Sequence, residues 1–473
     1  MGGLPKKASK LQELRQKNPS LLTVDGGALL FNDEKIFLRQ RQQLTTTARG
    51  LVRAYNFMGY QAVGIARQDL GGGLDFLREI QKESDFPWLS ANLVGKKDHK
   101  PIFSPGVVIE QGRLKIALLG LTGDGADTLF TAKDNAVILP WPQVLADLLP
   151  GFAAQADFVI LLSNLPFDQN KKIATLFPQI HLIIQAGVAT ANIAPQLINN
   201  TLITQTEKQG KHIGLLKANW NREMKKWDTE PNKELLGLKK ELDKLTWQLA
   251  RYRKKGDPEE VFKDKANTLA AYHQMLRQEE ALRQAIAGLS HNPTIEAKSN
   301  EEPSTYQGRF LAMEKEVPDH PEVLAIVNAT TKEANAINKN IFASQDEATP
   351  PPYLGSATCL PCHEKQGKKW QKSKHARAYE TLIAKNQQFN PQCIPCHITV
   401  DPELADIGKA ELKKELLMVS CESCHGSGAG HVQSPQDNKL TMPDETICHN
   451  CHTPDHDDDF KFKRDLDFLQ CGS

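Results

Sequence analysis

Four copies of a Cys-x-x-Cys-His pattern lie within residues 359–452, and they constrain this chain more than any other feature. Two thiols three positions apart can each bond one vinyl group of the same porphyrin, and the following His then binds the iron from below the ring. The pattern therefore predicts four covalently attached c-type haems. The attachment cysteines are Cys359, Cys362, Cys393, Cys396, Cys421, Cys424, Cys448 and Cys451, and the proximal ligands are His363, His397, His425 and His452.

Two other kinds of structure use Cys-x-x-Cys pairs, and neither explains this pattern. A zinc ribbon shares one metal between two pairs but does not require a His after each of them. A disulfide framework gives no reason for the histidines either. The ninth cysteine, Cys471, lies near the end of the chain. It is either a free terminal thiol or half of an intermolecular disulfide, and both interpretations stay open.

Length and charge limit the number of domains and the kinds of partner this chain can have. A chain of 473 residues has room for two or three domains. Its net charge of +1 does not indicate nucleic acid or a membrane surface as a partner, and no apolar run is long enough to span a bilayer. The first residues lack the apolar segment of a signal peptide. Because c-type haems are attached outside the cytoplasmic membrane, we infer that a signal peptide was removed or that the true start differs. We expect a periplasmic or extracellular, cell-surface location.

The first region, residues 1–225, alternates strand and helix patterns. Apolar runs of strand length lie at 21–31, 62–65, 158–162 and 181–184, and helix patterns lie at 51–58 and 73–80. Residues 107–119 predict a hairpin that turns at Gln111-Gly112. Buried strands that alternate with amphipathic helices predict an α/β layered sandwich.

The second region, residues 226–345, is dominated by helix patterns. A heptad seam runs through Leu235, Leu238, Leu242, Leu245, Leu249 and Tyr252. Asp257 can cap the next helix with Pro258 at its first position, and a second apolar stripe runs over 269–289. We expect an antiparallel, coiled-coil-like helical hairpin, either projecting as an arm or packed on the first domain. One more helix is expected at 323–337.

The third region, residues 346–473, follows a proline-rich linker and has few aliphatic runs. A domain with so little apolar side chain cannot build an ordinary core. Four porphyrins would supply that apolar surface, so we expect a mostly helical domain with little regular sheet that folds only with its haems.

Histidines outside the motifs are candidates for the sixth position on each iron, which decides what a haem can do. We expect His375 and His431 to be distal ligands. His449 lies inside the fourth motif and is expected to be a bystander. His456 is either a ligand or an exposed residue of an acidic loop, and His320 is an outside candidate.

The third region resembles the tetrahaem cytochrome c family of the cytochrome c-554 type, which accepts electrons from hydroxylamine oxidation. The stretches that carry this resemblance are Tyr353-Leu-Gly, Trp370, Ser373-Lys-His375-Ala, Asn390-Pro-Gln-Cys393, Cys421-Glu-Ser-Cys424-His425-Gly with His431, and Cys448-His-Asn-Cys451-His452-Thr. The resemblance implies mostly bis-His haems in stacked pairs and one open haem, held by His397. The residues after His397 depart from the glycine-containing version of related proteins.

The first region resembles the metallophosphoesterase domain of the periplasmic nucleotidase family. The stretches that match are 24–31, 58–64, 72–76, 86–92, 112–122 and 156–165. That family binds two metals through Asp, Asn and His. Here Ala28, Arg67-Gln68-Asp69, Asn164 and Ala186-Gly187-Val188-Ala189 stand at the ligand positions, and Asp25 and Asp69 alone cannot hold two metals. The resemblance therefore implies a phosphoesterase fold without phosphoesterase activity.

These observations predict an exported cytochrome that moves single electrons along four haems, with no catalytic residue and an inactive scaffold or docking domain. Its expected partners are redox proteins, either other cytochromes or a quinol-linked or other membrane-linked donor. The alternative is a haem oxidoreductase that acts on a small nitrogen species at one five-coordinate haem. The helical arm and Cys471 leave room for self-association.

Overall fold

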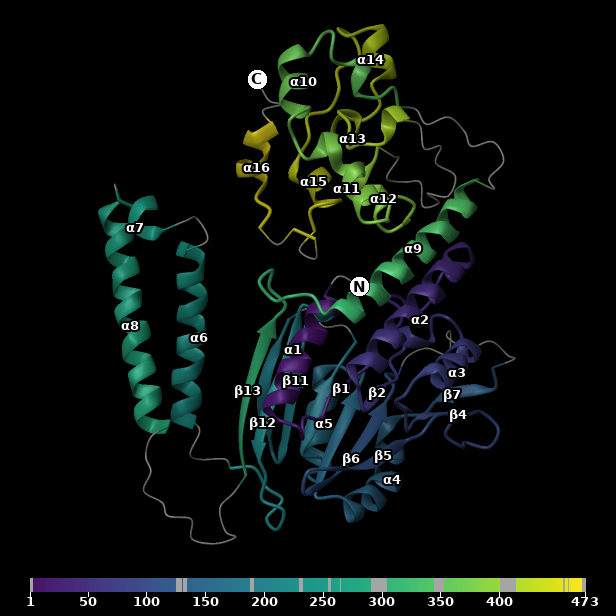
Figure 1. Cartoon of the computed structure of the whole chain (residues 1–473), viewed down its shortest axis with the longest axis vertical. Coiled ribbons are helices and arrows are strands. Elements are labelled where there is room, and N and C mark those ends of the chain that lie inside the picture. The colour runs from purple at the N-terminus through teal and green to yellow at the C-terminus, as the bar shows by residue number, and fades with distance from the viewer. Residues whose placement is uncertain are drawn as a thin grey trace.

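The computed structural model describes residues 3–124, 130, 134–187, 191–228, 233–253, 257–263, 265–290, 304–343, 353–399, 414–453, 456–457 and 459–469. Figure 1 shows an α/β region, a two-helix arm beside it and a mostly helical C-terminal region. Cys471 lies outside the described residues, as does most of the proline-rich linker. In the described part of the chain, no helix combines the length and the apolarity needed to cross a bilayer.

The main sheet of the α/β region has the strand order β10-β11-β9-β8-β6-β5. Its strands are β5 (Gly106–Gln111), β6 (Leu114–Leu121), β8 (Phe158–Ser163), β9 (Leu182–Gln185), β10 (Ile193–Ile198) and β11 (Thr201–Gln205). The four central strands are parallel, and β5 and β10 pair antiparallel at the edges. All six residues of β8 are buried, as expected for a parallel strand covered on both faces. The predicted hairpin is confirmed as β5 and β6.

A second, smaller sheet joins three short parallel strands, and an antiparallel pair lies beside it. These strands are β1 (Val24–Asp25), β2 (Ala62–Gly64) and β3 (Trp88–Leu89), with β4 (Leu93–Gly95) and β7 (Ala136–Ile138) as the pair. The helices of this region are α1 (Leu4–Lys17), α2 (Arg41–Met58), α3 (Leu74–Glu83), α4 (Trp141–Gln155) and α5 (Phe167–Leu176), with 3-10 turns at Leu38–Gln40, Gln68–Leu70 and Lys208–Gly210.

The strand expected over 21–31 is wrong beyond β1. Ala28 adopts a left-handed φ of 59°, and the backbone N–H groups of Ala28, Leu29 and Leu30 donate to the buried Asp69 carboxylate at 2.8 Å each. The backbone of 28–30 therefore wraps around the Asp69 carboxylate and does not pair with a neighbouring strand. Leu30 and Phe31 are buried within this loop, and their apolar side chains produced the strand-like pattern.

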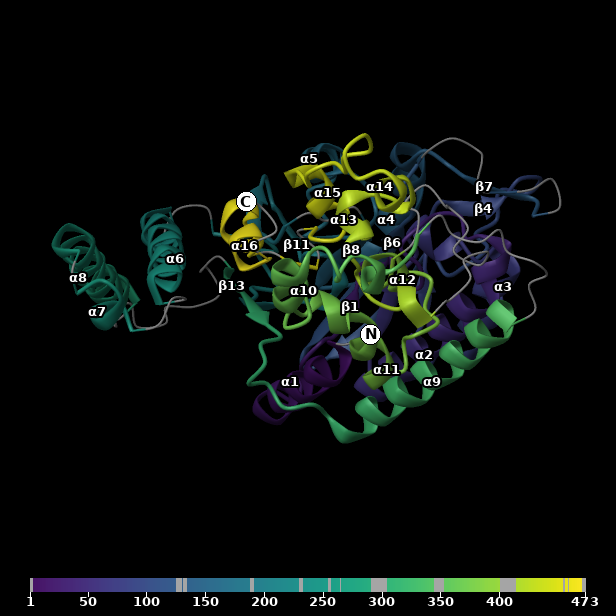
Figure 2. The ribbon, with the colours of Figure 1, turned by 90° about the horizontal axis from the view of Figure 1, so that it is seen from above.

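The helical hairpin is inserted between two paired strands. β12 (His212–Asn219) and β13 (Thr305–Ala312) pair antiparallel along their whole length, and α6 (Lys233–Arg253), α7 (Pro258–Val261) and α8 (Ala266–Ser290) lie between them in sequence. The sequence pattern did not predict β13. The expected cap is confirmed, because Asp257 accepts from the N–H of Glu259 and Pro258 follows it. Leu245, Leu249 and Tyr272 form the buried seam of the arm, and Figures 1 and 2 show the arm to one side of the sheets.

Helix α9 (Pro321–Ala343) packs on the α/β region and reaches the C-terminal region (Figure 2). It crosses α2 closely, because a Cβ on Gly50 would lie 2.4 Å from the Thr330 hydroxyl. Further along α9, Asn335 accepts a hydrogen bond from the N–H of Phe389 at 3.1 Å. Phe389 lies shortly before the second Cys-x-x-Cys-His motif, so α9 joins that segment to the α/β region.

The C-terminal region consists of short helices and 3-10 turns linked by loops, and in the described residues it contains no strand. Its helices are α10 (Glu364–Trp370), α11 (Ala378–Ala384), α12 (Ile394–His397), α13 (Glu422–His425), α14 (Ala429–Gln433), α15 (Glu445–His449) and α16 (Phe462–Leu469), with 3-10 turns at Ser356–Thr358, His375–Arg377 and Lys414–Leu416. The expectation of a mostly helical region is confirmed.

Candidate functional site: four haem-attachment motifs

Each of the four motifs forms about one turn of helix. The backbone N–H of His363, His425 and His452 donates to the carbonyl of the first Cys of its own motif, at 2.9 to 3.0 Å. Positions i, i+3 and i+4 of a helical turn share one face, so this turn favours a common side for the two thiols and the imidazole of a motif. No disulfide joins any of the eight attachment cysteines. Both observations are compatible with thioether attachment.

Two pairs of histidines lie close together, with interplanar angles of 33° and 74°. The ring centroids of His363 and His431 are 6.2 Å apart, and those of His375 and His452 are 5.9 Å apart. Imidazole binds a transition metal at about 2 Å, so two rings on opposite sides of one iron have centroids roughly 6 Å apart. The spacing of both pairs therefore fits an iron between the rings. Burial, and secondly the facing His452, lowers the pKa of His375, which favours its neutral, ligating form.

Hydrogen bonds orient several of these imidazoles through Nδ1. His397 donates to the carbonyl of Ala378, His425 to Thr441 and His431 to Asn438, each at 2.8 Å. A carbonyl only accepts, so Nδ1 carries the proton and Nε2 remains available to a metal.

His452 differs, because its Nδ1 lies 2.7 Å from a carboxylate oxygen of Asp457. Its ring also stacks on Phe460, with centroids 4.6 Å apart. A carboxylate partner raises the basicity of a ligating imidazole more than a carbonyl does. The sequence pattern did not single out Asp457, although it lies only five residues beyond the motif.

The remaining histidines have other partners. His449 has Nδ1 3.1 Å from the His452 carbonyl and Nε2 3.6 Å from Glu445, as expected of a bystander. His456 is exposed and bonds the Thr453 hydroxyl at 2.9 Å. His320 packs edge-on against Phe57 in the α/β region. In the described part of the chain, no second imidazole makes ring contact with His397 or His425.

The motifs also contact one another through their thiols. Cys359 donates a hydrogen bond to Cys421, which lowers the pKa of Cys421 to about 6 and raises that of Cys359. Cys451 donates in the same way to Cys396, which lowers the pKa of Cys396 to about 7. Motif one therefore lies against motif three, and motif two lies against motif four.

A buried carboxylate inside the third motif connects the segments that carry the first and third motifs. Glu422 is 3% exposed and accepts hydrogen bonds from the backbone N–H groups of Leu354, Gly355 and Gly428. Leu354 begins the segment of motif one, and Gly428 begins the turn that carries His431. Glu422 thus fixes His431 relative to His363. Sequence reasoning missed this role, because the two residues between the cysteines of a motif take no part in haem attachment.

In the α/β region, the positions at which the nucleotidase family binds its metals form other contacts in this chain. Asp69 is fully buried, and its four backbone N–H donors counteract the burial that raises its pKa to about 6. Arg67 forms a two-pronged ion pair with Glu34, with both N–O distances 2.7 Å. Asn164 accepts from the N–H of Arg67 at 3.1 Å. Among the described residues, no three His, Cys, Asp or Glu side chains converge on a metal-sized site.

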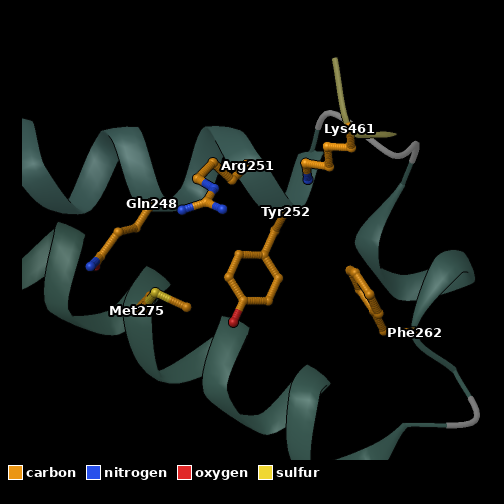
Figure 3. Close-up of a pocket in the computed structure, with 6 residues that line it drawn as sticks. All are labelled: Gln248, Arg251, Tyr252, Phe262, Met275 and Lys461. Carbon is orange, nitrogen blue, oxygen red and sulfur yellow. The ribbon is translucent and has the colours of Figure 1, made fainter. Parts of the chain in front are cut away.

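A cavity of about 450 Å³ lies at the end of the arm. It is lined by Gln248, Arg251, Tyr252, Phe262, Met275 and Lys461, none of which is a motif residue (Figure 3). Lys461 comes from the segment before α16, and the other residues come from the arm. The cavity therefore marks an approach of the arm to the C-terminal region.

Comparison with known proteins supports the two-part character of the chain. Residues 358–426 match the family model described as cytochrome c554 and c-prime. Cytochrome c-554 of Nitrosomonas europaea is 29% identical over 103 residues, which cover 19% of this chain and 44% of that protein. The family implies covalent c-type haems, and the C-terminal region is accordingly cytochrome c554-like.

The other relatives are nucleotidase-like. Protein UshA of Escherichia coli is 38% identical over 72 residues, which cover 15% of this chain and 13% of UshA. The structure of calcineurin-like phosphoesterase YfkN from Bacillus subtilis aligns with 70% of this chain and 88% of that chain, at 15% identity and a TM-score of 0.44. The chain spans less than half of the length of UshA and of cytochrome c-554. The sequence matches indicate a nucleotidase-like α/β region followed by a cytochrome c554-like region.

Proposed function

We propose that this protein is an exported multihaem cytochrome that transfers single electrons along four covalently bound c-type haems. The facing histidine pairs, with ring centroids 6.2 and 5.9 Å apart, are the observation that carries the proposal. Two imidazoles on one iron give a closed, low-spin site, which suits electron transfer. When bound, each haem would supply a one-electron couple.

Different residues would attach each haem and ligate its iron. The eight motif cysteines would attach the porphyrins, and His363, His397, His425 and His452 would be the proximal ligands. His431 would be the second ligand opposite His363, and His375 would be the second ligand opposite His452. The proximity of Cys359 to Cys421, and of Cys396 to Cys451, supports an arrangement of the motifs in two pairs, the first with the third and the second with the fourth.

The number of histidines favours a second candidate function, that of an oxidoreductase acting on a small nitrogen species. With His375 and His431 assigned and His449 turned to the His452 carbonyl and to Glu445, His456 remains for two irons, those of His397 and His425. At least one iron would then lack a histidine from this region. We assign the open position to His397, as the resemblance implies.

We further propose that the α/β region is a phosphoesterase-like scaffold without phosphoesterase activity. Arg67 brings a positive charge to a position where the nucleotidase family places a metal ligand, and Glu34 already neutralises that charge. A guanidinium has only hydrogen-bond donors and cannot ligate a metal, so Arg67 does not replace the missing ligand. Metal-dependent hydrolysis of a nucleotide by the purified chain would contradict this proposal.

Electron paramagnetic resonance of the oxidised, haem-loaded chain, with and without nitric oxide, tests the proposal. Low-spin signals that the gas leaves unchanged would mean a closed sixth position at every iron and electron transfer alone. A high-spin signal that shifts with the gas would mean an open iron, and turnover of the gas would then favour the oxidoreductase. The chain's likeness to UshA and to c-type cytochromes, which are typically exported, supports an external location with redox proteins as partners.

A further inference from the structure

The segment 364–377 carries far more positive charge than the chain as a whole. It contains five Lys and one Arg against a single Glu, a net charge of +5, whereas the whole chain has a net charge of +1. The other residues together are therefore net negative. The charge lies on α10 and the turns that follow it.

The fold turns these cations outward. Gly367 is buried against Leu360, where a Cβ would lie 2.3 Å from a methyl group, and Trp370 donates from Nε1 to the Val419 carbonyl at 2.9 Å. These two residues anchor the inner side of α10. The basic side chains lie on the outer side and are all exposed: Lys365, Lys368, Lys369, Lys372, Lys374 and Arg377. We call this set the α10 basic face.

Most of this charge is not neutralised within the chain. Lys368 pairs with Glu364, and in the described residues the other cations of the face have no ion-pair partner. The neighbouring α16 does not compensate, because Arg464 already pairs with Asp459 and Asp465. A patch of uncompensated, exposed cations creates a local potential that attracts acidic partners.

The α10 basic face lies between residues of two different candidate haem sites. Cys362 and His363 directly precede α10 and are exposed. His375 lies among the cations at the other end and faces His452 of the fourth motif. A protein bound to this face would therefore lie close to the first and fourth motifs. Electron transfer requires the partner to bind close to a haem, and a charged surface without a redox role would have no reason to lie there.

We propose that the α10 basic face is the docking surface for an acidic redox partner protein. The inference rests on the proposed electron-transfer function and adds the surface and the chemistry of the partner. Complementary charge speeds association with a redox protein and orients it. The chain as a whole has a net charge of only +1, so the attraction of an acidic partner is local to surfaces such as this face.

The test uses the full haem-loaded chain and a reduced acidic [2Fe–2S] ferredoxin as the electron donor in stopped-flow mixing. The variant reverses three unpaired cations, Lys365→Glu, Lys369→Glu and Lys372→Glu. The matched control makes the same charge change at exposed sites of the α/β region, Lys96→Glu, Lys97→Glu and Lys100→Glu. A second variant with Gln at the three α10 positions tests neutralisation, in case charge reversal impairs haem attachment.

We expect the α10 charge-reversal variant to be reduced at least about tenfold more slowly at low ionic strength, with its salt dependence lost. The Gln variant should be intermediate, and the control should match the original chain. Equal rates for all chains, or equal slowing in the control, would overturn the inference. So would an unchanged ferredoxin rate combined with α10-dependent binding to phosphatidylserine vesicles. Absence of covalent haem in the unmutated chain, measured by mass, would instead overturn the proposed function.

Discussion

The α/β region and the C-terminal region differ in how they bury apolar surface. The α/β region contains three clusters of buried apolar side chains, built from strands such as β8 and from the helices that cover them. In the described C-terminal residues the corresponding cluster consists of Tyr379, Leu382, Ile394 and Ile398. The α/β region therefore has an ordinary core of side chains, whereas the C-terminal region needs another source of apolar surface for its interior.

The difference indicates where the haems matter for folding. The C-terminal region places its Cys and His side chains in contact with one another, at positions where an ordinary domain would bury Leu and Val. Four porphyrins, each a large apolar plate, would supply the missing surface. The α/β region needs no such addition, because its central strands β6, β8 and β11 are already largely buried.

The largest expected effect comes from preventing haem attachment. Replacing all eight motif cysteines by Ser should leave the α/β region folded and unfold the C-terminal region, because the haem-free region lacks a core. Hydrogen exchange read by mass spectrometry should show protection in β6 and β8 and rapid exchange across 353–399 and 414–453. Slow exchange in the latter segments of the haem-free chain would refute the comparison.

A cavity in the α/β core should destabilise only that region. Leu161 is fully buried in the middle of β8, so Leu161→Ala is expected to lower the free energy of unfolding by about 2–5 kcal/mol. Leu176→Ala is the control, since Leu176 is 63% exposed and its truncation should change stability by less than about 0.5 kcal/mol. The measurement is thermal unfolding, with the haem absorption spectrum followed separately. Loss of the haem spectrum in parallel would show that the two regions unfold together.

Acid should weaken the α/β region through His181. This His accepts a hydrogen bond from the N–H of Val159 and is packed against Trp220, and burial lowers its pKa to about 3. The unfolded chain gains this proton below about pH 6.5, so the stabilisation is complete above that pH and falls as the pH drops toward 3. Between pH 7 and pH 5 the loss is about 2 kcal/mol. Denaturant titration of His181→Gln, which keeps an acceptor, should show a pH dependence smaller by that amount.

The smallest expected effect concerns one haem and no unfolding. Asp457→Asn should raise the reduction potential of the haem held by His452, because an amide is a weaker acceptor and leaves the imidazole less basic. Spectroelectrochemical titration measures the potential, and the control is Asp437→Asn, an exposed position that bonds Ser434. A titration curve identical to that of the original chain would show that the carboxylate has no influence on the iron.

The candidate haem site was predicted largely from spacing, and the α/β region was predicted from alternation of patterns. The strands β5, β6, β8 and β9 and the helices α2, α3, α6 and α8 appear where periodicity indicated them. The segment after β1 was mispredicted, because capture of its N–H groups by Asp69 overrides its apolar pattern. β13 was not anticipated, since its partner β12 is separated from it by the whole helical arm.

By itself, the sequence determined the attachment chemistry, because a haem motif is a local arrangement within five consecutive residues. It also identified His375 and His431 as candidates, but it did not assign either one to an iron. Only the tertiary structure placed His431 opposite His363 and His375 opposite His452, because each pair joins segments more than sixty residues apart. The same is true of Glu422, whose role depends on backbone groups brought from distant segments. The residues that attach one haem can be read from local sequence spacing, whereas the pairing of motifs with one another depends on how the whole chain folds.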